Sequence, residues 1–460
     1  MRLLPLLLVC AAGCASTRLV ARVTPSPPGA YLVQNVNVFD GEQAVGLRDV
    51  RIFDGKIDAV AEAGTLQPSD GEELVSGEGR TLLPGLVDAH AHIETHGEPI
   101  WAVGLPRVDD IAQAYLYAGV TSALIMQGST QATELRARAA AGEVPAPHLH
   151  LAGPRLTAPD GFPINLYEAL LPWPFSALVT SGIDRATTAE QARAAVDAAK
   201  ERFAPEFYKI TCDAFPPGTP KLTAEAMTAA IARAKELGVR PTAHVGTPED
   251  VMLAAEAGLA LFAHPPSSGV LTDGQVAKLA SLGVPFVSTL RFLTGPNDYA
   301  KDHGSPLDRE MATPQLLEAL GNRPADFEYP AVSKDLDLDA MLVRYQGNLR
   351  DNLKKLFDAG VPIFLGTDAG SPGVVPGASL HRELRVAVEA GLSPTQALKA
   401  ATSAPADFLD PAHRFGRVAP GQRADLLLVN GDPTQDIAAT EAVAEVFFEG
   451  RRLLRTTERP

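Results

Sequence analysis

The chain has 460 residues, which corresponds to roughly three domains at about 150 residues each, although a single barrel also reaches this size. Hydrophobic residues make up 46% and charged residues 21%, which excludes a disordered chain, and the scattered glycines and prolines exclude a collagen-like one. The net charge of −15 argues against nonspecific binding to nucleic acid, so we expect no nucleic-acid partner.

The first residues have the layout of a secretory signal, with one arginine before a short apolar stretch. The small residues Ala11-Ala12-Gly13 directly precede Cys14, and this pattern resembles the bacterial lipobox, in which cleavage leaves the cysteine as a lipid-bearing N-terminus. We therefore predict a signal peptide over 1–13, a lipid anchor at Cys14 and a tether over 14–30. The protein is then an exported cell-envelope lipoprotein, held to a membrane by its anchor. An ordinary signal peptide is the alternative.

The next residues and the last ones have the pattern of short β-strands. Apolar alternation after Tyr31 is broken by the turn pairs Asp40-Gly41 and Asp54-Gly55, which favour hairpins. A similar block closes the chain, around the turn Asn430-Gly431. We predict that 31–80 and 415–455 form one small, discontinuous β-sandwich domain.

The middle of the chain repeats a unit of helix, glycine and strand. Thr187 and Glu190 predict a capping box at the start of one helix, and the step from glycine to strand recurs at Gly119, Gly238, Gly283 and Gly360. About eight such units predict the α/β class and a (β/α)₈ barrel of the TIM type over 81–414. The rival is a doubly wound open sheet, but the glycine-rich phosphate-binding fingerprint is absent after every predicted strand.

Polar residues end several of the predicted strands. His90 and His92 lie on the same side of one strand because strand side chains alternate, and such a pair is able to chelate a metal ion. Four further strands end at Lys209, His244, His264 and Asp368. In a barrel all six residues meet at the C-terminal face, where the active sites of barrels are built. The second His-x-His pair, His148 and His150, falls inside a strand and is not expected to bind metal.

In this order the motifs resemble the amidohydrolase superfamily, in particular its imidazolonepropionase-like and prolidase-like (Xaa-Pro dipeptidase) branch. The matching segments are Leu83 to His92, the strand lysine, two histidines separated by 20 positions, Leu365 to Asp368, Leu380 to Leu384, and Gly416 to Leu426. The resemblance runs from about Tyr31 to Leu453.

The resemblance implies a site for two divalent metal ions. One ion is held by His90, His92 and Asp368, and the other by His244 and His264, with Lys209 bridging both as a carbamate. We expect zinc, although manganese, iron and cobalt suit the same ligands. A metal-bridging hydroxide then attacks the substrate carbonyl, and Asp368 transfers its proton to the leaving amine. The implied reaction on a small molecule is hydrolysis of an amide bond, in a dipeptide or an N-acyl amino acid.

Contacts with the substrate are less clearly marked. Arg291, Tyr208 and Arg155 are candidates for substrate binding, and His381 is a candidate for supporting the ligands from behind. The sequence departs from the family at Pro265, where glycine is usual, and at 160–163, where relatives often carry a histidine. These departures concern the choice of substrate more than the metal chemistry.

Two alternatives remain. The first is a mononuclear deaminase or cyclic-amide or lactone hydrolase, in which Lys209 is not carbamylated. The second is a barrel scaffold or binding protein without catalysis, although degenerate barrels normally lose ligand positions and this sequence keeps all six. The sequence leaves a homo-oligomer open.

Overall fold

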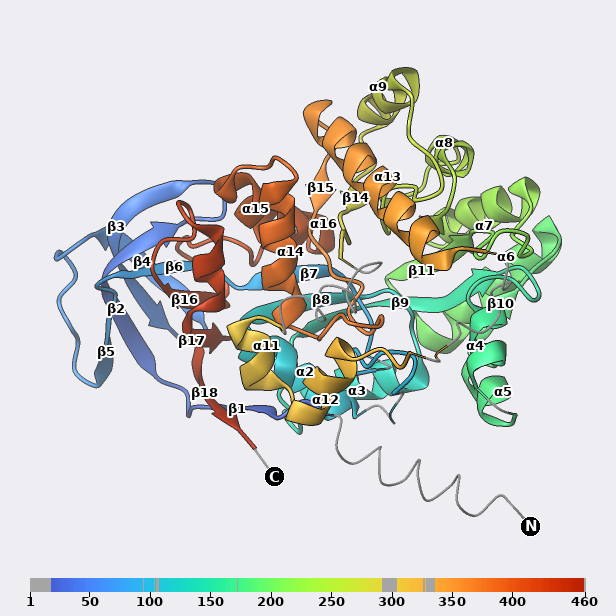
Figure 1. Ribbon diagram of the computed structural model, residues 1–460. Helices are drawn as coiled ribbons and strands as arrows, with labels where there is room; N and C mark the ends of the chain where they lie inside the picture. The colour runs from blue at the N-terminus through green and yellow to red at the C-terminus, as the bar shows by residue number, and fades with distance from the viewer. Residues whose placement is uncertain are drawn as a thin grey trace, which may run out of the picture.

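The computed structural model describes residues 18–458, except 94, 103, 105, 106, 172, 292–303, 326 and 328–335. The predicted signal peptide and the predicted anchor Cys14 therefore lie outside the described residues. The described residues form two sheets of nine strands, one enclosed by helices and one at the side of the molecule (Figure 1). Within these ranges, no helix combines the length and the apolar character that crossing a membrane requires.

Eight parallel strands of the first sheet follow one another in chain order and confirm the predicted (β/α)₈ barrel. The backbone closes the barrel between the last and the first strand, since the amide of Ala89 donates to Leu365 (3.1 Å) and that of His92 to Ala369 (2.8 Å). A ninth strand, β10 (Ile183–Arg185), extends β9. The barrel strands are β7 (Leu86–Ala91), β8 (Val120–Ile125), β9 (His148–Thr157), β11 (Phe207–Cys212), β12 (Arg240–Val245), β13 (Leu261–Phe262), β14 (Phe286–Val287) and β15 (Ile363–Phe364).

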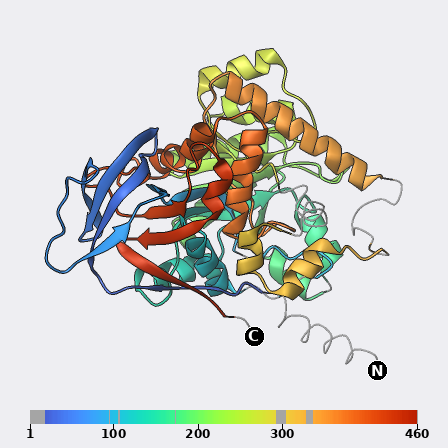
Figure 2. The same ribbon diagram turned by 60° about the vertical axis from the view of Figure 1, so that its left-hand side comes forward.

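Helices surround the barrel and follow its strands along the chain (Figure 2). Short helices lie in the loops after β9 and β14 and in the segment after α14. The long helices are α2 (Val108–Tyr117), α3 (Thr130–Ala140), α6 (Ala189–Phe203), α7 (Ala224–Glu236), α8 (Pro248–Glu256), α9 (Asp273–Leu282), α13 (Leu338–Asp358) and α14 (Ala378–Glu389). The short ones are α4 (Ile164–Leu170), α5 (Phe175–Thr180), α11 (Pro306–Met311), α12 (Pro314–Gly321), α15 (Pro394–Ala400), α16 (Ser403–Leu409) and the 3₁₀ helix η1 (Ile437–Glu441).

Threonine side chains fix the starts of several helices by accepting hydrogen bonds from backbone amides that have no partner within the helix. Thr223, Thr247 and Thr272 do so for α7, α8 and α9. The capping box of α6 is formed by Thr188 and Gln191, one residue later than the sequence pattern predicts. The adjacent Thr187 instead contacts the same glutamine side chain.

Side chains alternate along each barrel strand, so the apolar core has one part between the barrel and its helices and another part inside the barrel. On β11, Tyr208 and Ile210 pack outward under the helices, whereas Phe207 belongs to a cluster inside the barrel with Leu261 and Phe364. Leu409 of α16 joins this inner cluster. Apolar side chains thus fill one end of the barrel interior, and polar strand-end residues are left to line the other end.

The two ends of the chain form the second sheet, as predicted. Side chains from both ends, such as Val36 and Ile52 with Leu426 and Phe447, share one buried cluster. The order of the main path is β1 (Ala21–Pro25), β18 (Arg451–Thr457), β17 (Val443–Phe448), β16 (Leu426–Asn430), β6 (Arg80–Pro84), β2 (Ala30–Phe39), β3 (Ala44–Phe53) and β4 (Lys56–Glu62), with β5 (Glu72–Ser76) beside β2.

Two predicted boundaries differ from the structure. Residues 21–25, predicted as part of the tether, form β1 and pair with β18, because Ala21 and Val23 bury their side chains in the main core cluster, to which α2 also contributes. Residues 81–84, predicted as the start of the barrel, belong to β6 and pair with β2 and β16. The barrel itself begins at Leu86.

Asp425 joins the small sheet to the barrel. It is almost fully buried just before β16, ion-pairs with Arg423 and lies 3.3 Å from Nε2 of His148 on β9. The amide of Glu449 also donates to it at 2.8 Å. The other histidine of this His-x-His pair, His150, contacts Glu206 at 2.8 Å. Both histidines of the pair thus contact carboxylates at the start of β9.

We expect Asp425→Asn to lower the free energy of unfolding by about 1–3 kcal/mol, because the partly buried side chain of Arg423 loses its counter-charge. Burial opposes ionisation of Asp425, but His148 and Arg423 outweigh it and lower its pKa. The stabilisation is therefore present at neutral pH and disappears as pH falls through the folded-state pKa. Urea unfolding measures the loss. Glu449→Gln, which removes an exposed carboxylate 3.9 Å from His148, is the control and should cost under about 1 kcal/mol; equal effects of the two changes would contradict the prediction.

Candidate metal centre and active site

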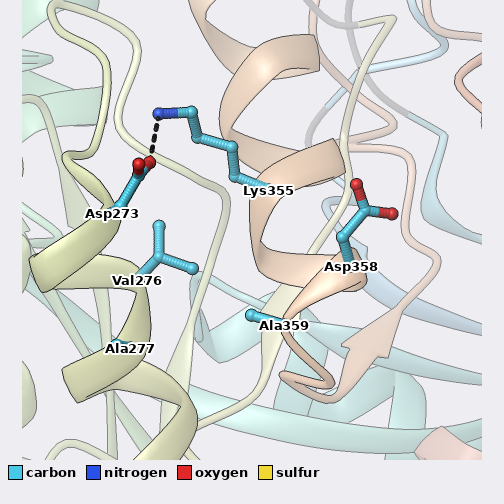
Figure 3. A pocket seen from close by; sticks show the side chains of 6 residues that line it. All are labelled: Asp273, Val276, Ala277, Lys355, Asp358 and Ala359. Atoms are coloured by element: carbon cyan, nitrogen blue, oxygen red, sulfur yellow. Dashed lines mark hydrogen bonds and ion pairs between the residues drawn. The ribbon is translucent and has the colours of Figure 1, made fainter.

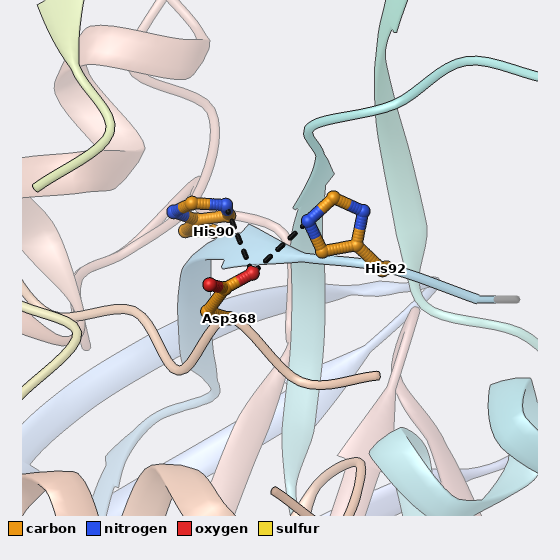
Figure 4. A group of neighbouring side chains, drawn as sticks. All are labelled: His90, His92 and Asp368. Carbon is orange, nitrogen blue, oxygen red and sulfur yellow. Dashed lines mark ion pairs between the residues drawn. The ribbon is translucent and has the colours of Figure 1, made fainter. Parts of the chain in front are cut away.

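Three of the predicted ligands converge at the end of the first barrel strand. Nε2 of His90 lies 3.2 Å and Nε2 of His92 lies 3.0 Å from Oδ1 of Asp368 (Figure 4). The three ligand atoms lie within 4.8 Å of one another, and His90 is buried. Two imidazole nitrogens and a carboxylate oxygen at this spacing are a set of donors that a divalent metal ion accepts.

The neutral ring of His90 directs a lone pair, and not a proton, toward Asp368. Nδ1 of His90 lies 3.0 Å from the carbonyl oxygen of Ala263, and a carbonyl only accepts, so Nδ1 carries the proton. Burial lowers the pKa of His90 well below its ordinary value, so the ring is neutral and Nε2 has a lone pair. Burial opposes ionisation of Asp368, but His90, His92 and Lys209 outweigh it and hold its pKa well below the usual range. The lone pair on Nε2 of His90 therefore faces the carboxylate of Asp368, and a cation bound between the two atoms would satisfy both.

The other two histidines show the same arrangement. Nδ1 of His264 donates to the carbonyl oxygen of Pro265 (2.8 Å), and Nε2 of His244 donates to Oδ2 of Asp213 (2.8 Å). The remaining nitrogens, Nε2 of His264 and Nδ1 of His244, are 2.6 Å apart and face each other with their lone pairs. The rings are nearly perpendicular, at 86°. A proton on either ring or a metal ion bound by both rings satisfies this pair of nitrogens.

Lys209 lies close to both groups. Its side chain is 1% exposed, and among the residues that the structure describes Nζ has no hydrogen-bond partner. Burial lowers the pKa of Lys209 well below its ordinary value, with Arg155 adding to the shift and Asp368 opposing it. Arg155 is its neighbour in register on β9 and is itself buried. The interior thus places two basic side chains next to each other.

The turn that carries Asp368 is held by a residue that the sequence analysis did not single out. Asp88 accepts hydrogen bonds from the amide (3.0 Å) and hydroxyl (2.6 Å) of Thr367 and from the amide of His90 (3.2 Å). Asp368 itself has a φ of 57°, which is unfavourable for a residue other than glycine and typical of functional positions. Positions 88, 90 and 92 share one side of the strand, so period-two alternation was the available signal.

Two other residues at the site were missed. Phe162, in the segment after β9, places its ring 5.3 Å from the ring of His244. Asp213 directly follows β11 and contacts His244. Alternation again gives the signal for the acid, because positions 209 and 213 point to the same side of the chain. Nothing in the sequence pattern alone places Phe162 against a ligand.

Two candidates from the sequence lie away from the site. Tyr208 points outward, as alternation next to Lys209 requires, and its hydroxyl donates to Asp184 at 3.0 Å. His381 is fully buried on α14, with Nε2 2.8 Å from the carbonyl oxygen of Ala118 at the end of α2. These contacts replace the predicted roles in substrate binding and ligand support by roles in packing.

Arg291 is buried at the end of β14, where Glu383 of α14 holds the chain. Oε1 of Glu383 accepts from the hydroxyl of Ser288 (2.5 Å) and the amide of Leu290 (2.8 Å). Burial raises the pKa of Glu383 to about 7, although these donors and Arg291 favour the carboxylate. Glu383 thereby fixes the backbone from which Arg291 extends.

We expect Glu383→Gln to flatten the dependence of stability on pH. An unfolded glutamate loses its proton near pH of about 4.3, whereas folded Glu383 keeps it until about 7, so folding stability falls as pH rises through this window. The fall should shrink by on the order of 3–4 kcal/mol in the variant. Burial also raises the pKa of Asp88 to about 7, so the variant should retain part of the dependence of stability on pH. Urea unfolding of the metal-free protein across this range is the measurement, and an unchanged slope contradicts the assignment.

A surface hollow of about 340 Å³ lies apart from these residues, between α9 and α13 (Figure 3). Its lining contains one ion pair, between Lys355 and Asp273 at 3.2 Å, and no histidine or cysteine. The hollow therefore contains none of the predicted metal ligands, and the strand ends of the barrel are the better candidate for a functional site.

Comparison with known proteins agrees with this geometry. Residues 81–453 match the model of a family described as the amidohydrolase family. The imidazolonepropionase of Deinococcus radiodurans is 38% identical over 104 residues, which cover 22% of this chain and 26% of that protein. Adenine deaminase 3 of Rhizobium meliloti is 24% identical over 448 residues, 95% of this chain and 60% of that protein. The chain thus aligns with about a quarter of the imidazolonepropionase.

Solved structures share the fold at low sequence identity. A Xaa-Pro dipeptidase with bound methionine has a TM-score of 0.72 at 21% identity, covering 92% of this chain and 99% of that one. The ochratoxinase of A. niger has a TM-score of 0.68 at 18% identity, covering 93% and 95%. The family match extends over most of the sequence and includes every proposed ligand. This chain therefore belongs to the amidohydrolase family.

Proposed function

We propose that the protein hydrolyses an amide bond of a small molecule with two divalent metal ions, zinc in the first instance. The observation that carries the proposal is the set of hydrogen bonds that three histidine rings make on the side away from the site. At His90, His244 and His264 the proton points away from the site, toward Ala263, Asp213 and Pro265. The unprotonated nitrogens therefore converge on positions where a cation satisfies them.

His90, His92 and Asp368 would hold one ion, and His244 and His264 the other. Lys209 would bridge them as a carbamate, formed when its amine adds CO₂. The buried position of Nζ without a hydrogen-bond partner supports this modification, and so does the nearby Arg155. Carbamylation converts a pair of basic neighbours into an ion pair, which removes an unfavourable buried charge contact.

Bound metal ions would polarise the substrate carbonyl and make a water molecule nucleophilic at neutral pH. The protein supplies the proton transfer. Oδ1 of Asp368 is the oxygen that faces both imidazoles, which leaves Oδ2 to take a proton from the attacking water and deliver it to the leaving nitrogen. The strained turn at Asp368 and its anchor Asp88 keep this carboxylate in place.

A substrate with a carboxylate fits the surroundings of the site. Arg155 and Arg291 are both buried near the ends of barrel strands, and a buried guanidinium is a strong partner for a carboxylate. Dipeptides and N-acyl amino acids combine such a carboxylate with an amide bond. One of the solved relatives is a Xaa-Pro dipeptidase, which gives this class of substrate further support.

The test is a count of metal ions combined with a screen of substrates. Protein purified without chelator should contain two ions per chain by mass spectrometry. After loading with zinc, manganese or cobalt, it should hydrolyse dipeptides or N-acyl amino acids faster than the matching amides that lack the carboxylate. Absence of turnover for every amide in all three metal forms would refute the proposal.

The mononuclear alternative has one observation in its favour, since an adenine deaminase aligns with 95% of the chain. One ion per chain, unmodified Lys209 and release of ammonia from an aminopurine would support it. A chain that binds no metal ion at all would instead favour a scaffold or binding role.

We also propose that the mature protein is attached to a membrane of the cell envelope through Cys14. The lipobox-like residues before this cysteine support the proposal. Labelling cells with radioactive palmitate should mark the wild-type protein and leave Cys14→Ser unmarked, and equal labelling of both would contradict it.

A further inference from the structure

We propose that Asp213 is a positioning residue that sets the affinity of the second metal ion by fixing the ring of His244. The inference rests on the proposed function, because it assigns a role toward an ion held by His244 and His264. The observation behind it is the 2.8 Å contact between Oδ2 of Asp213 and Nε2 of His244, on the side of the ring away from His264.

The contact selects one tautomer of His244. A carboxylate only accepts hydrogen bonds, so Nε2 carries the proton, and the neutral ring that a metal ion requires then keeps its lone pair at Nδ1. Asp213 is in the right place because it follows β11, the strand next to β12, which carries His244. Its side chain is 11% exposed, so water competes little for the hydrogen bond.

The charge of this partner distinguishes His244 from His90 and His264. His90 and His264 donate to the neutral backbone carbonyls of Ala263 and Pro265. His244 donates to an anion, which makes the ring a stronger electron donor at Nδ1. Asp213 therefore acts on the second ion, whereas the ion at His90, His92 and Asp368 does not depend on it.

The surrounding residues hold Asp213 against the ring. A Cβ atom at Gly246 would lie 2.1 Å from Oδ1 of Asp213, so the carboxylate occupies space that only glycine leaves. Phe162 packs against the ring of His244 with 5.3 Å between centroids. A side chain at position 246 is thus a second way to displace the carboxylate, independent of any change to Asp213 itself.

The experiment measures the two stepwise dissociation constants of cobalt or zinc in competition with a chelator, on the full mature chain. In the wild type we expect two ions. Asp213→Ala should weaken one constant by about 10–100-fold and leave the other unchanged, and Asp213→Asn, which keeps an acceptor oxygen without charge, should fall between. Gly246→Ala should reproduce the loss. The absorption spectrum of cobalt should change for the weakened site only.

Asp184→Asn is the matched control, because Asp184 is a partly buried acid that contacts Tyr208 and no ligand, and it should change neither constant. Two unchanged constants in Asp213→Ala and Gly246→Ala would overturn the inference. A wild type that binds fewer than two ions would instead refute the proposed function, so the two failures are distinct. If Asp213→Ala does not fold, as judged by circular dichroism, Asp213→Asn and Gly246→Ala decide the question by the same constants.

Discussion

Asparagine in place of Asp368 is expected to lower kcat by about 10³-fold, within the range that positioned acid–base groups contribute. Asparagine has the same shape but takes no proton at its side-chain oxygen, so the leaving nitrogen departs without protonation. It also replaces the anionic oxygen that lies 3.0–3.2 Å from His92 and His90. The backbone turn should persist, because Asp88 holds Thr367 and not the side chain of residue 368.

Steady-state kinetics on the best substrate from the screen, with metal content measured on the same sample, tests this expectation. Asp273→Asn is the control, since the Asp273 side chain is 98% exposed and pairs with Lys355 outside the barrel. The control should leave kcat unchanged. A kcat of Asp368→Asn within about tenfold of the wild type, with both ions bound, would show that another group moves the proton.

Removing the amine in Lys209→Ala is expected to cost one of the two ions and at least about 100-fold in activity, because the proposed bridging ligand that the protein supplies is lost. The metal-free variant should nevertheless unfold at the same temperature as the metal-free wild type, or at a higher one. The reason is that Nζ is buried beside Arg155 without a hydrogen-bond partner in the described structure, so the unmodified lysine contributes no favourable pairing.

Metal analysis, activity and thermal unfolding of the same preparation separate these effects. Acetate or propionate should restore part of the activity by placing a carboxylate where the carbamate would lie. Lys355→Ala, which changes an exposed lysine, should leave metal content and activity unaltered. Unchanged activity with a single ion in both wild type and Lys209→Ala would favour the mononuclear alternative.

Local patterns predict the barrel and the position of the ligands. The step from glycine to a short apolar strand recurs with each unit, and parallel strands in a closed barrel bring their C-terminal ends to one face. His90, Lys209 and Asp368 therefore meet although they are far apart in the sequence. Period-two alternation also predicts that Lys209 points inward and that Tyr208 does not.

Other features depend on contacts that no local pattern shows. The sequence around His381 does not show its partner. Only the packing of α14 against the end of α2 reveals that its imidazole contacts Ala118. The strand at 21–25 has few residues with a preference for strands and forms because β18 offers it a partner. Alternation places Asp213 on the same side of the chain as Lys209, but it does not name the partner, and the contact with His244 follows from the pairing of β11 with β12.

The pairing of β1 with β18 and of β6 with β16 constrains how the protein is made. The ribosome releases the first half of the small sheet long before its partner strands, so during synthesis β6 and β2 expose hydrogen-bonding edges next to apolar side chains. The small domain is completed only when the last residues have emerged. Truncation of the C-terminus should therefore leave an aggregation-prone chain, even though every proposed metal ligand lies before the cut.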